Sequence, residues 1–243
     1  MNALTLPDEP QRLSKVVAAT MSCSRREAEQ YIVEGWVRVD GEVVEQPQFR
    51  VGGTQRVEID PRARLQPAAP VTLLLHKPAG VASEQAQALL GASSQWSADT
   101  SAIRYARSHG TGPAPLLVLP TPASGLSVLS QERGVVRKLT EDAALIEQEL
   151  IADVSGSIAP DGLARLRHGL VREGKALPAA HVSWQNEARL RFAVKGIAPE
   201  WIAWMCAQVG LELTALKRIR IGRIPMAGLP VGQWRYLRAG ERF

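Results

Sequence analysis

The first 60 residues place hydrophobic and polar positions in a pattern that predicts two short helices. Residues 12–21 carry hydrophobic side chains at helical spacing, and residues 24–35 repeat the pattern with a clear buried stripe. Ser24 followed three residues later by Glu27 forms a capping-box pattern, which predicts that the second helix begins there.

A small sheet is predicted after the two helices. Val37 and Val39 lie just before the pair Asp40-Gly41, which is typical of a tight β-hairpin, and residues 51–60 supply one more strand. Together these elements predict a compact domain over residues 10–60. Residues 61–70 hold three prolines without hydrophobic periodicity, so we expect an extended linker there.

Residues 71–243 predict a larger α+β domain with a mixed, mainly antiparallel sheet. Strands and helices are interspersed without regular βαβ spacing, which favours the α+β class. Residues 84–112 have weak patterning and are interpreted as a variable loop with one helix. We expect strands within 71–75, 116–130, 146–156, 181–184, 188–194, 216–224 and 233–237, and helices within 135–144, 163–170 and 200–210.

Composition and charge narrow the class of protein. The chain has 243 residues, of which 45% are hydrophobic and 22% charged, as expected for a globular protein. Its net charge is +5, and residues 161–243 hold 14 Lys and Arg against 6 Asp and Glu. A basic excess of this kind is compatible with a nucleic-acid partner and equally with a solvated surface.

The cellular location is inferred from the segments that the sequence lacks. No hydrophobic run approaches the roughly 18 residues of a membrane helix, so we expect no membrane association. The N-terminus has no apolar core of a secretory signal, and the two cysteines are far apart, which indicates a reducing cytoplasm. We expect a monomer.

Several motifs carry a resemblance to a known family. These are RLSKVV and CSRREAEQYIVEGWVRVDG, then HKPAG, SGLSVLS, LARLRHGLV with REGKALPA, and LKRIRIGRIPMAGLPVGQWRYL. Residues 12–60 resemble the S4 domain, an RNA-binding module. The whole chain resembles bacterial ribosomal-RNA pseudouridine synthases with an N-terminal S4 domain. The resemblance implies binding to structured rRNA or a ribosomal particle, without cofactor or metal.

The chain departs from this family at the positions that carry its chemistry. The family motif Arg-Leu-Asp, whose Asp acts on the flipped uridine, matches Val118, Leu119 and Pro120. The family's Tyr beside the target base matches Leu150, and its arginine-containing helix start matches residues 196–205, which contain no arginine. We therefore expect no catalytic residues and an RNA-binding protein without isomerase activity.

Two other hypotheses about function remain open. An active pseudouridine synthase could use a displaced acid, and a carboxylate in the cleft near Pro120 would favour that enzyme. Asp153 is predicted to point to the opposite face of its strand from Leu150, and Asp99 lies in the variable loop without the Gly-Leu that follows the motif. Alternatively, the chain is a protein-interaction module whose hydrophobic cleft binds a partner.

The basic residues at matching positions are candidate RNA contacts. Their alternative role is a solvated surface, and the tryptophans Trp201 and Trp204 are interpreted as core residues at helical spacing rather than as a base-stacking pair. Arg218 and Arg220 alternate along a strand, which predicts that they share one face. The candidate RNA-binding residues are Arg12, Lys15, Ser24, Arg25, Arg26, Arg38, Lys77, Arg218 and Arg220. We expect the S4-like domain to supply most of the affinity.

Overall fold

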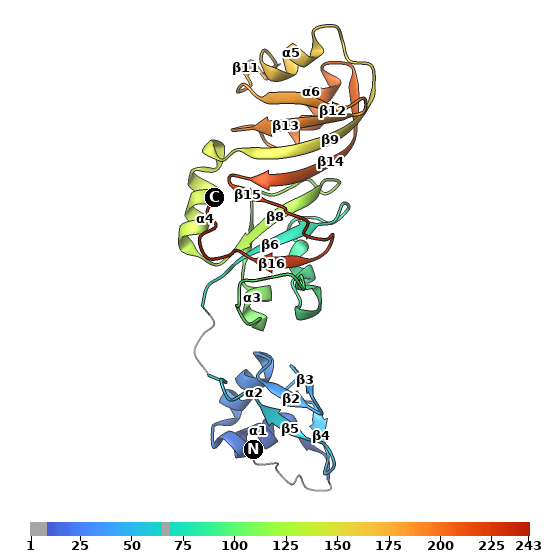
Figure 1. Ribbon diagram of the computed structural model, residues 1–243. Helices are drawn as coiled ribbons and strands as arrows, with labels where there is room; N and C mark the ends of the chain where they lie inside the picture. Colours follow the sequence, from blue (N-terminus) through green and yellow to red (C-terminus); the bar gives the residue numbers. More distant parts are fainter. Residues whose placement is uncertain (1–8, 65–68) are drawn as a thin grey trace. The chain divides into compact units, whose positions relative to one another are not determined.

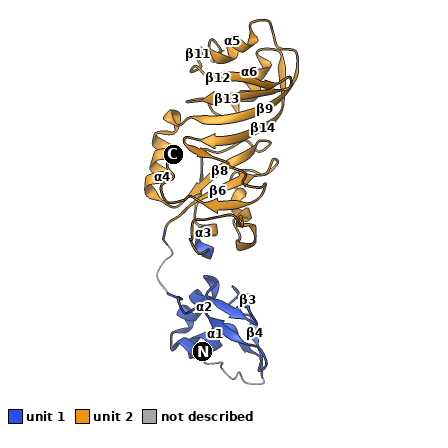
Figure 2. Cartoon of the chain, viewed as in Figure 1, with its two compact units in different colours: residues 1–69, 105–109 blue, residues 70–104, 110–243 orange. Residues whose placement is uncertain are grey.

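A computed structural model describes residues 9–64 and 69–243. The chain divides into two compact units (Figure 1, Figure 2): unit 1 comprises residues 1–69 with 105–109, and unit 2 comprises 70–104 with 110–243. The sequence analysis placed residues 105–109 in the second domain. Of the predicted linker, residues 65–68 lie outside the described residues, as does the N-terminal stretch 1–8.

Unit 1 contains the two predicted helices and a small sheet. Its elements are β1 (Gln11–Arg12), α1 (Leu13–Met21), α2 (Arg25–Val33), β2 (Val37–Val39), β3 (Glu42–Val43), β4 (Arg50–Val51) and β5 (Val57–Ile59). Strand β2 lies between β3 and β5, and β1 pairs with β4, all antiparallel. The single strand predicted over 51–60 is two short strands, because a turn at Gly52, closed by the Gln55 amide, separates them.

Local sequence explains where these elements begin and turn. The Ser24 hydroxyl accepts from the Glu27 amide at 3.2 Å, and the Ser24 amide donates to the Glu27 carboxylate at 2.7 Å, so the predicted capping box is confirmed. Asp40 and Gly41 both have positive φ, 53° and 88°, as the hairpin requires. Leu13, Val17, Ile32 and other hydrophobic side chains from both helices and the sheet form one buried core.

In the described part of unit 2, nine strands form one sheet. The order is β12-β13-β9-β14-β8-β6-β16, with β15 on β14 and β7 on β8. All neighbours are antiparallel except β14 and β8, which run parallel. The strands are β6 (Thr72–Lys77), β7 (Ala114–Leu116), β8 (Ser124–Ser130), β9 (Gln148–Gly156), β12 (His181–Asn186), β13 (Arg189–Val194), β14 (Leu211–Ile221), β15 (Ile224–Pro225) and β16 (Trp234–Tyr236).

The remaining elements of unit 2 are short helices and one hairpin. They are η1 (Ala86–Leu89), η2 (Ala92–Ser94), α4 (Arg133–Glu141), η3 (Ala143–Leu145), α5 (Gly162–Arg167), α6 (Trp201–Ala207) and the pair β10 (Val171–Arg172) and β11 (Lys175–Ala176); α3 (Arg107–Thr111) is divided between the two units. The predicted α+β class is confirmed. Residues 84–112, predicted as a variable loop with one helix, contain the α-helix α3 and two short 3₁₀ helices, η1 and η2.

The two faces of the sheet differ in character. Leu150, Ala152 and Val154 of β9 are buried against the core that α5 and α6 cover, and we call this side the helix face. Glu149 and Asp153 alternate with them and point to the other side, which we call the open face. The prediction that Asp153 points away from Leu150 is therefore confirmed.

The parallel contact between β8 and β14 has no room for a side chain. Gly125 pairs with Arg218, and a Cβ atom added at Gly125 would lie 2.2 Å from the Arg218 carbonyl oxygen. The φ of Gly125 is 111°, a conformation that residues with a Cβ rarely adopt. Glycine is thus required at this position for the two strands to meet.

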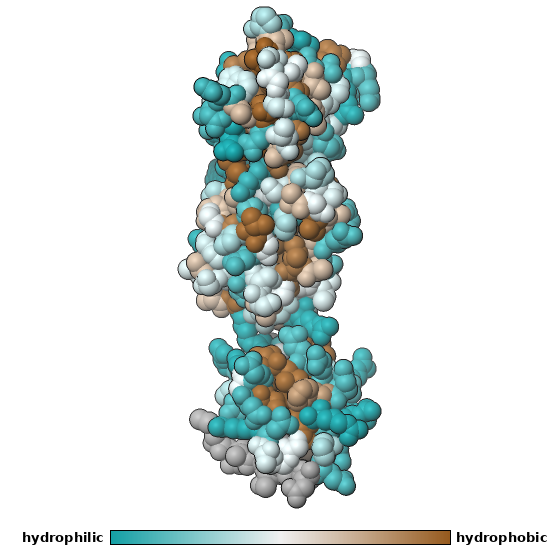
Figure 3. All heavy atoms as spheres, turned by 90° about the vertical axis from the view of Figure 1, so that its right-hand side faces the viewer, coloured by the Kyte–Doolittle hydropathy of each residue, from teal (hydrophilic) through white to brown (hydrophobic). Residues whose placement is uncertain are grey.

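The face drawn in Figure 3 mixes hydrophilic and hydrophobic residues on both units. Within the described ranges, no helix is long and hydrophobic enough to cross a bilayer.

Substitution of Gly125 tests the importance of this junction. Gly125→Ala should lower the free energy of unfolding by about 3 kcal/mol, because it combines an unfavourable φ with a backbone clash. Chemical denaturation followed by circular dichroism measures the change. Gly134→Ala is the matched control, since a Cβ there meets no atom within 4 Å and α4 favours alanine. Equal stability of the two variants would contradict the requirement for glycine at position 125.

Candidate nucleic-acid interface and central cleft

A groove on unit 1 gathers three of the predicted RNA-binding residues. It has a volume of about 580 Å³ and is lined by Pro10, Gln11, Arg12, Lys15, Ala18 and Arg25. Arg12 and Lys15 lie at the start of α1, and Arg25 is the first residue of α2. No acidic residue lines the groove, although unit 1 as a whole is rich in glutamate, so its local charge is positive.

The helix terminus next to this groove adds to the attraction for an anion. The amides at the start of an α-helix lack intrahelical acceptors and carry partial positive charge. Ser24 uses its hydroxyl to cap the Glu27 amide, so its side chain organises α2. Arg25 projects from the same turn with 61% of its side chain exposed, and its one ion pair, to Glu29 at 3.4 Å, is solvated.

Two other predicted residues of unit 1 lie outside the groove. Arg26 is exposed on the first turn of α2, and Arg38 is exposed on β2, where its guanidinium donates to the Gly41 carbonyl at 2.8 Å. The structure therefore unites Arg12, Lys15 and Arg25 in one groove and leaves Arg26 and Arg38 as separate surface charges.

The central cleft of unit 2 consists of two pockets on the helix face. One, of about 310 Å³, is lined by residues 117–118, 143–144, 148 and 196–200. The other, of about 260 Å³, contains Pro120 and Pro122 and continues to residues 199–203 and 213–216. Both are lined mainly by hydrophobic and backbone atoms, as the substitutions noted in the sequence predict.

The positions that depart from the family motif are part of this cleft or directly beneath it. Val118 lines the first pocket and is 50% exposed, and Pro120 lines the second. Leu150 is fully buried in the core and offers the cleft no hydroxyl group.

Glu200 is the one ionisable side chain among the residues that line the two pockets, and the sequence analysis missed it. It is exposed, lies at the N-cap of α6 and belongs to the lining of both pockets. The absence of arginine from residues 196–205 was noted from the sequence, but the carboxylate within the same stretch was not considered.

The two acids considered from sequence have structural partners elsewhere. Asp153 forms an ion pair with Arg189 at 2.5 Å on the open face. Asp99 accepts hydrogen bonds from the Tyr236 and Ser101 amides and from the Gln95 side chain. Burial opposes ionisation of Asp99, but these hydrogen bonds outweigh it and lower its pKa. Neither residue lines the cleft pockets.

Lys77, a candidate RNA contact, is fully buried. Its ammonium donates to the carbonyls of Val81 at 2.6 Å, Pro78 at 3.1 Å and Thr121 at 3.3 Å. Burial lowers the pKa of Lys77, and the nearby Arg218 guanidinium lowers it further. Lys77 thus fastens the loop that carries Pro120, and its charge is not presented to solvent.

The prediction that Arg218 and Arg220 share one face is wrong. A bulge in β14 lets Arg218 pair with Leu150 and Arg220 with Glu149, two adjacent residues that point to opposite faces. Arg218 is fully buried on the helix face and donates to the Leu126 carbonyl, the Leu117 carbonyl and the Gln148 side chain, so it is not available to RNA in this structure. Arg220 lies on the open face, paired with Glu147 and Glu149.

Trp201 and Trp204 pack partly buried against the core, in agreement with their interpretation as core residues. The Arg172 guanidinium lies 4.6 Å from the Trp201 ring centroid and covers that ring. A base would have to displace this cation to stack there.

Comparison with known proteins shows which proteins this chain is similar to. Residues 11–57 match the S4 domain. The chain is 26% identical over 240 residues to the dual-specificity RNA pseudouridine synthase RluF of Escherichia coli, covering 97% of this chain and 78% of that protein. It is 27% identical over 237 residues to ribosomal large subunit pseudouridine synthase B of Bacillus subtilis, covering 95% and 93%.

Two further matches agree. A chloroplast protein of Arabidopsis thaliana, assigned provisionally by its name to the ribosomal large subunit pseudouridine synthases, is 31% identical over 235 residues; the chain spans 56% of its length. A crystal structure of a pseudouridylate synthase aligns with a TM-score of 0.60 at 16% identity, over 94% of this chain and 96% of that one, and shows the shared fold. The chain is therefore similar over nearly its whole length to RNA pseudouridine synthases, and residues 11–57 match the S4 domain.

Neutralising the groove tests whether it contacts RNA. Lys15→Gln/Arg25→Gln should weaken binding to a structured rRNA fragment about tenfold at physiological salt, because phosphate contacts are lost. Each lost contact should also reduce the salt dependence of binding by about one unit. Fluorescence anisotropy titrations at several salt concentrations measure both. Arg56→Gln/Arg62→Gln removes the same charge from exposed positions of unit 1 outside the groove. Comparable losses from the two pairs would contradict a groove-specific contact.

Proposed function

We propose that this chain binds structured rRNA, or a ribosomal particle that presents it, and lacks pseudouridine synthase activity. The groove of Arg12, Lys15 and Arg25 supplies the main RNA contact, and the synthase-like unit contributes a scaffold whose cleft does not catalyse isomerisation. The protein acts in the cytoplasm as a monomer. The observation that carries the proposal is Pro120 in the cleft at the position of the family's aspartate.

The chemistry of isomerisation explains why this substitution matters. Breaking a C–N glycosidic bond and remaking it as a C–C bond needs a carboxylate next to the sugar, as nucleophile or as base. Proline has no ionisable group, and no rotamer of Pro120 supplies one. Leu150 lies buried where the family has a tyrosine, and the lining of both cleft pockets contains no arginine or lysine to orient an acid.

Glu200 favours a second candidate function, an active synthase with a displaced acid. Glu200 lines both pockets and lies at the N-cap of α6 rather than on the loop of Pro120. The full-length relatives are named as active enzymes, which is compatible with this alternative. Against it, Glu200 is exposed to solvent and has no cationic partner among the residues that line the cleft.

A direct assay separates the two functions. The purified protein should convert no uridine to pseudouridine in protein-free rRNA or in ribosomal subunits, measured by carbodiimide mapping and by mass spectrometry of nucleosides. Glu200→Gln is assayed in parallel. Pseudouridine formed by the natural chain and lost in Glu200→Gln would overturn the proposal in favour of the displaced acid.

Restoring the motif acid alone should not restore catalysis. Pro120→Asp places a carboxylate among Pro122, Ala123 and Leu216, where the hydrophobic surroundings would raise its pKa and leave it without a basic partner. We expect no turnover above background in the same assay. Measurable turnover by this single variant would mean that the rest of the cleft is still competent.

A further inference from the structure

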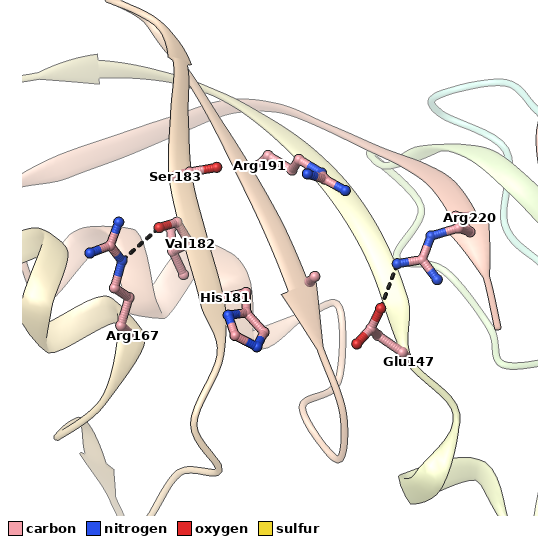
Figure 4. Close-up of a pocket in the computed structure, with 8 residues that line it drawn as sticks. Glu147, Arg167, His181, Val182, Ser183, Arg191 and Arg220 are labelled. Atoms are coloured by element: carbon pink, nitrogen blue, oxygen red, sulfur yellow. Dashed lines mark hydrogen bonds and ion pairs between the residues drawn. The ribbon is translucent and has the colours of Figure 1, made fainter. Parts of the chain in front are cut away.

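The open face of the sheet in unit 2 contains a second basic pocket, remote from the cleft. Its volume is about 580 Å³, and it is lined by Glu147, Arg167, His181, Val182, Ser183, Arg191, Ala193 and Arg220 (Figure 4). The cleft pockets lie on the helix face and share no lining residue with it. Arg167 and Arg220 lie within the motifs LARLRHGLV and LKRIRIGRI named above, whereas Ser183 and Arg191 lie outside all the motifs that carry the resemblance.

Strand register brings the polar side chains of this pocket together. Ser183 pairs with Arg191 across β12 and β13, and Glu149 pairs with Arg220 across β9 and β14. These positions alternate with the buried core residues, so their side chains project from the same face. Arg167 reaches the pocket from the end of α5 (Figure 4).

The acids of the pocket are already neutralised by its own arginines. Glu149 accepts from Arg191 at 2.5 Å and from Arg220 at 2.8 Å, while Glu147 accepts from Arg220 at 2.5 Å. These hydrogen bonds lower the pKa of both carboxyl groups, which stay ionised and fixed. Arg220 uses its remaining amino group on the Gly222 carbonyl, so it serves as the internal counterion.

Arg167 and Arg191 keep donors available for a ligand. Each guanidinium is held through Nε, Arg167 by the Val182 carbonyl at 2.8 Å and Arg191 by Glu149. Within the described part of the chain, their terminal amino groups make no hydrogen bond or ion pair, and 44% of the Arg191 side chain is exposed. Holding Nε orients the planar fork in advance, which reduces the entropy lost when it binds an anion.

This geometry fits a phosphate group. The guanidinium groups of Arg167 and Arg191 and the Ser183 hydroxyl line the same pocket and offer donors to a phosphate that enters it, and arginine forks match phosphate oxygens in bidentate fashion. Lys217 and Arg189 extend the basic surface on neighbouring rows of the same face. All these cations lie within residues 161–243, which hold 14 basic and 6 acidic residues.

We propose that the pocket formed by Arg167, Ser183 and Arg191 on the open face binds a backbone phosphate of the RNA, as a second contact independent of the S4 groove. The inference rests on the proposed RNA-binding function and names a surface for it on unit 2. It requires no participation of the cleft, and backbone contacts of this kind position an RNA without reading its sequence.

Binding by the full-length chain tests this site. Arg167→Gln/Arg191→Gln should weaken binding to a labelled structured rRNA fragment about fivefold to tenfold and reduce the salt slope by about one unit. Arg133→Gln/Arg137→Gln is the matched control, because it removes the same charge from exposed positions on α4, and it should change binding by less than twofold. Combining the pocket pair with Lys15→Gln/Arg25→Gln should give multiplied losses.

The outcomes separate this inference from the proposed function. If the natural chain binds RNA but the pocket pair behaves like the α4 pair, the inference is wrong and the proposed function stands. If the natural chain does not bind rRNA at all, both are wrong. Thermal melting checks the fold of each variant. Should the glutamine pair melt early, Arg167→Lys/Arg191→Lys keeps the charge but loses the forks, and unchanged affinity in that folded variant would also overturn the proposal.

Discussion

The close contact between Gly125 and Arg218 is the constraint on which unit 2 depends. It is the point where β8 meets β14 in parallel, and it joins the β6–β8–β16 half of the sheet to the β12–β13–β9–β14 half. The Arg218 side chain then spans the junction by donating to Leu126 on β8, to Leu117 before the Pro120 loop and to Gln148 on β9. A charged group here replaces the side-chain packing that Gly125 cannot provide.

A buried guanidinium without a carboxylate is expensive unless its donors are satisfied. Burial lowers the pKa of Arg218 to about 9, so it still carries its charge at neutral pH; its Nε and Nη1 donate to carbonyl and amide oxygens, while Nη2 is buried without a partner among the described residues. The Lys77 ammonium donates to the Thr121 carbonyl of the same loop and to the Pro78 and Val81 carbonyls of the turn after β6. These two cations bind the backbone carbonyls of Leu117 and Thr121, on either side of position 120, so this part of the scaffold does not depend on the side chain at that position.

Local patterns in the sequence were enough to predict much of the fold. The capping box at Ser24, the hairpin at Asp40-Gly41 and the period of two along β9 each depend on residues close in sequence, and each is confirmed. The faces of Arg218 and Arg220 could not be predicted this way, because a bulge adds one residue and reverses the alternation without a sequence signal. The burial of Lys77 and the place of Glu200 depend on carbonyls and pockets formed by segments distant in sequence.

Net charge is a poor guide to where an anion binds, and the two basic surfaces show why. Unit 1 is close to neutral, yet its groove is lined by three cations and no acid. On the open face of unit 2, Glu147 and Glu149 are paired with Arg220 and with the Nε of Arg191, and the terminal amino groups of Arg167 and Arg191 remain as donors. Two modest phosphate contacts on one chain also act together: once one is made, the second occurs at an effective concentration on the order of millimolar. Affinity for a large folded RNA can thus arise from positions that individually resemble an ordinary solvated surface.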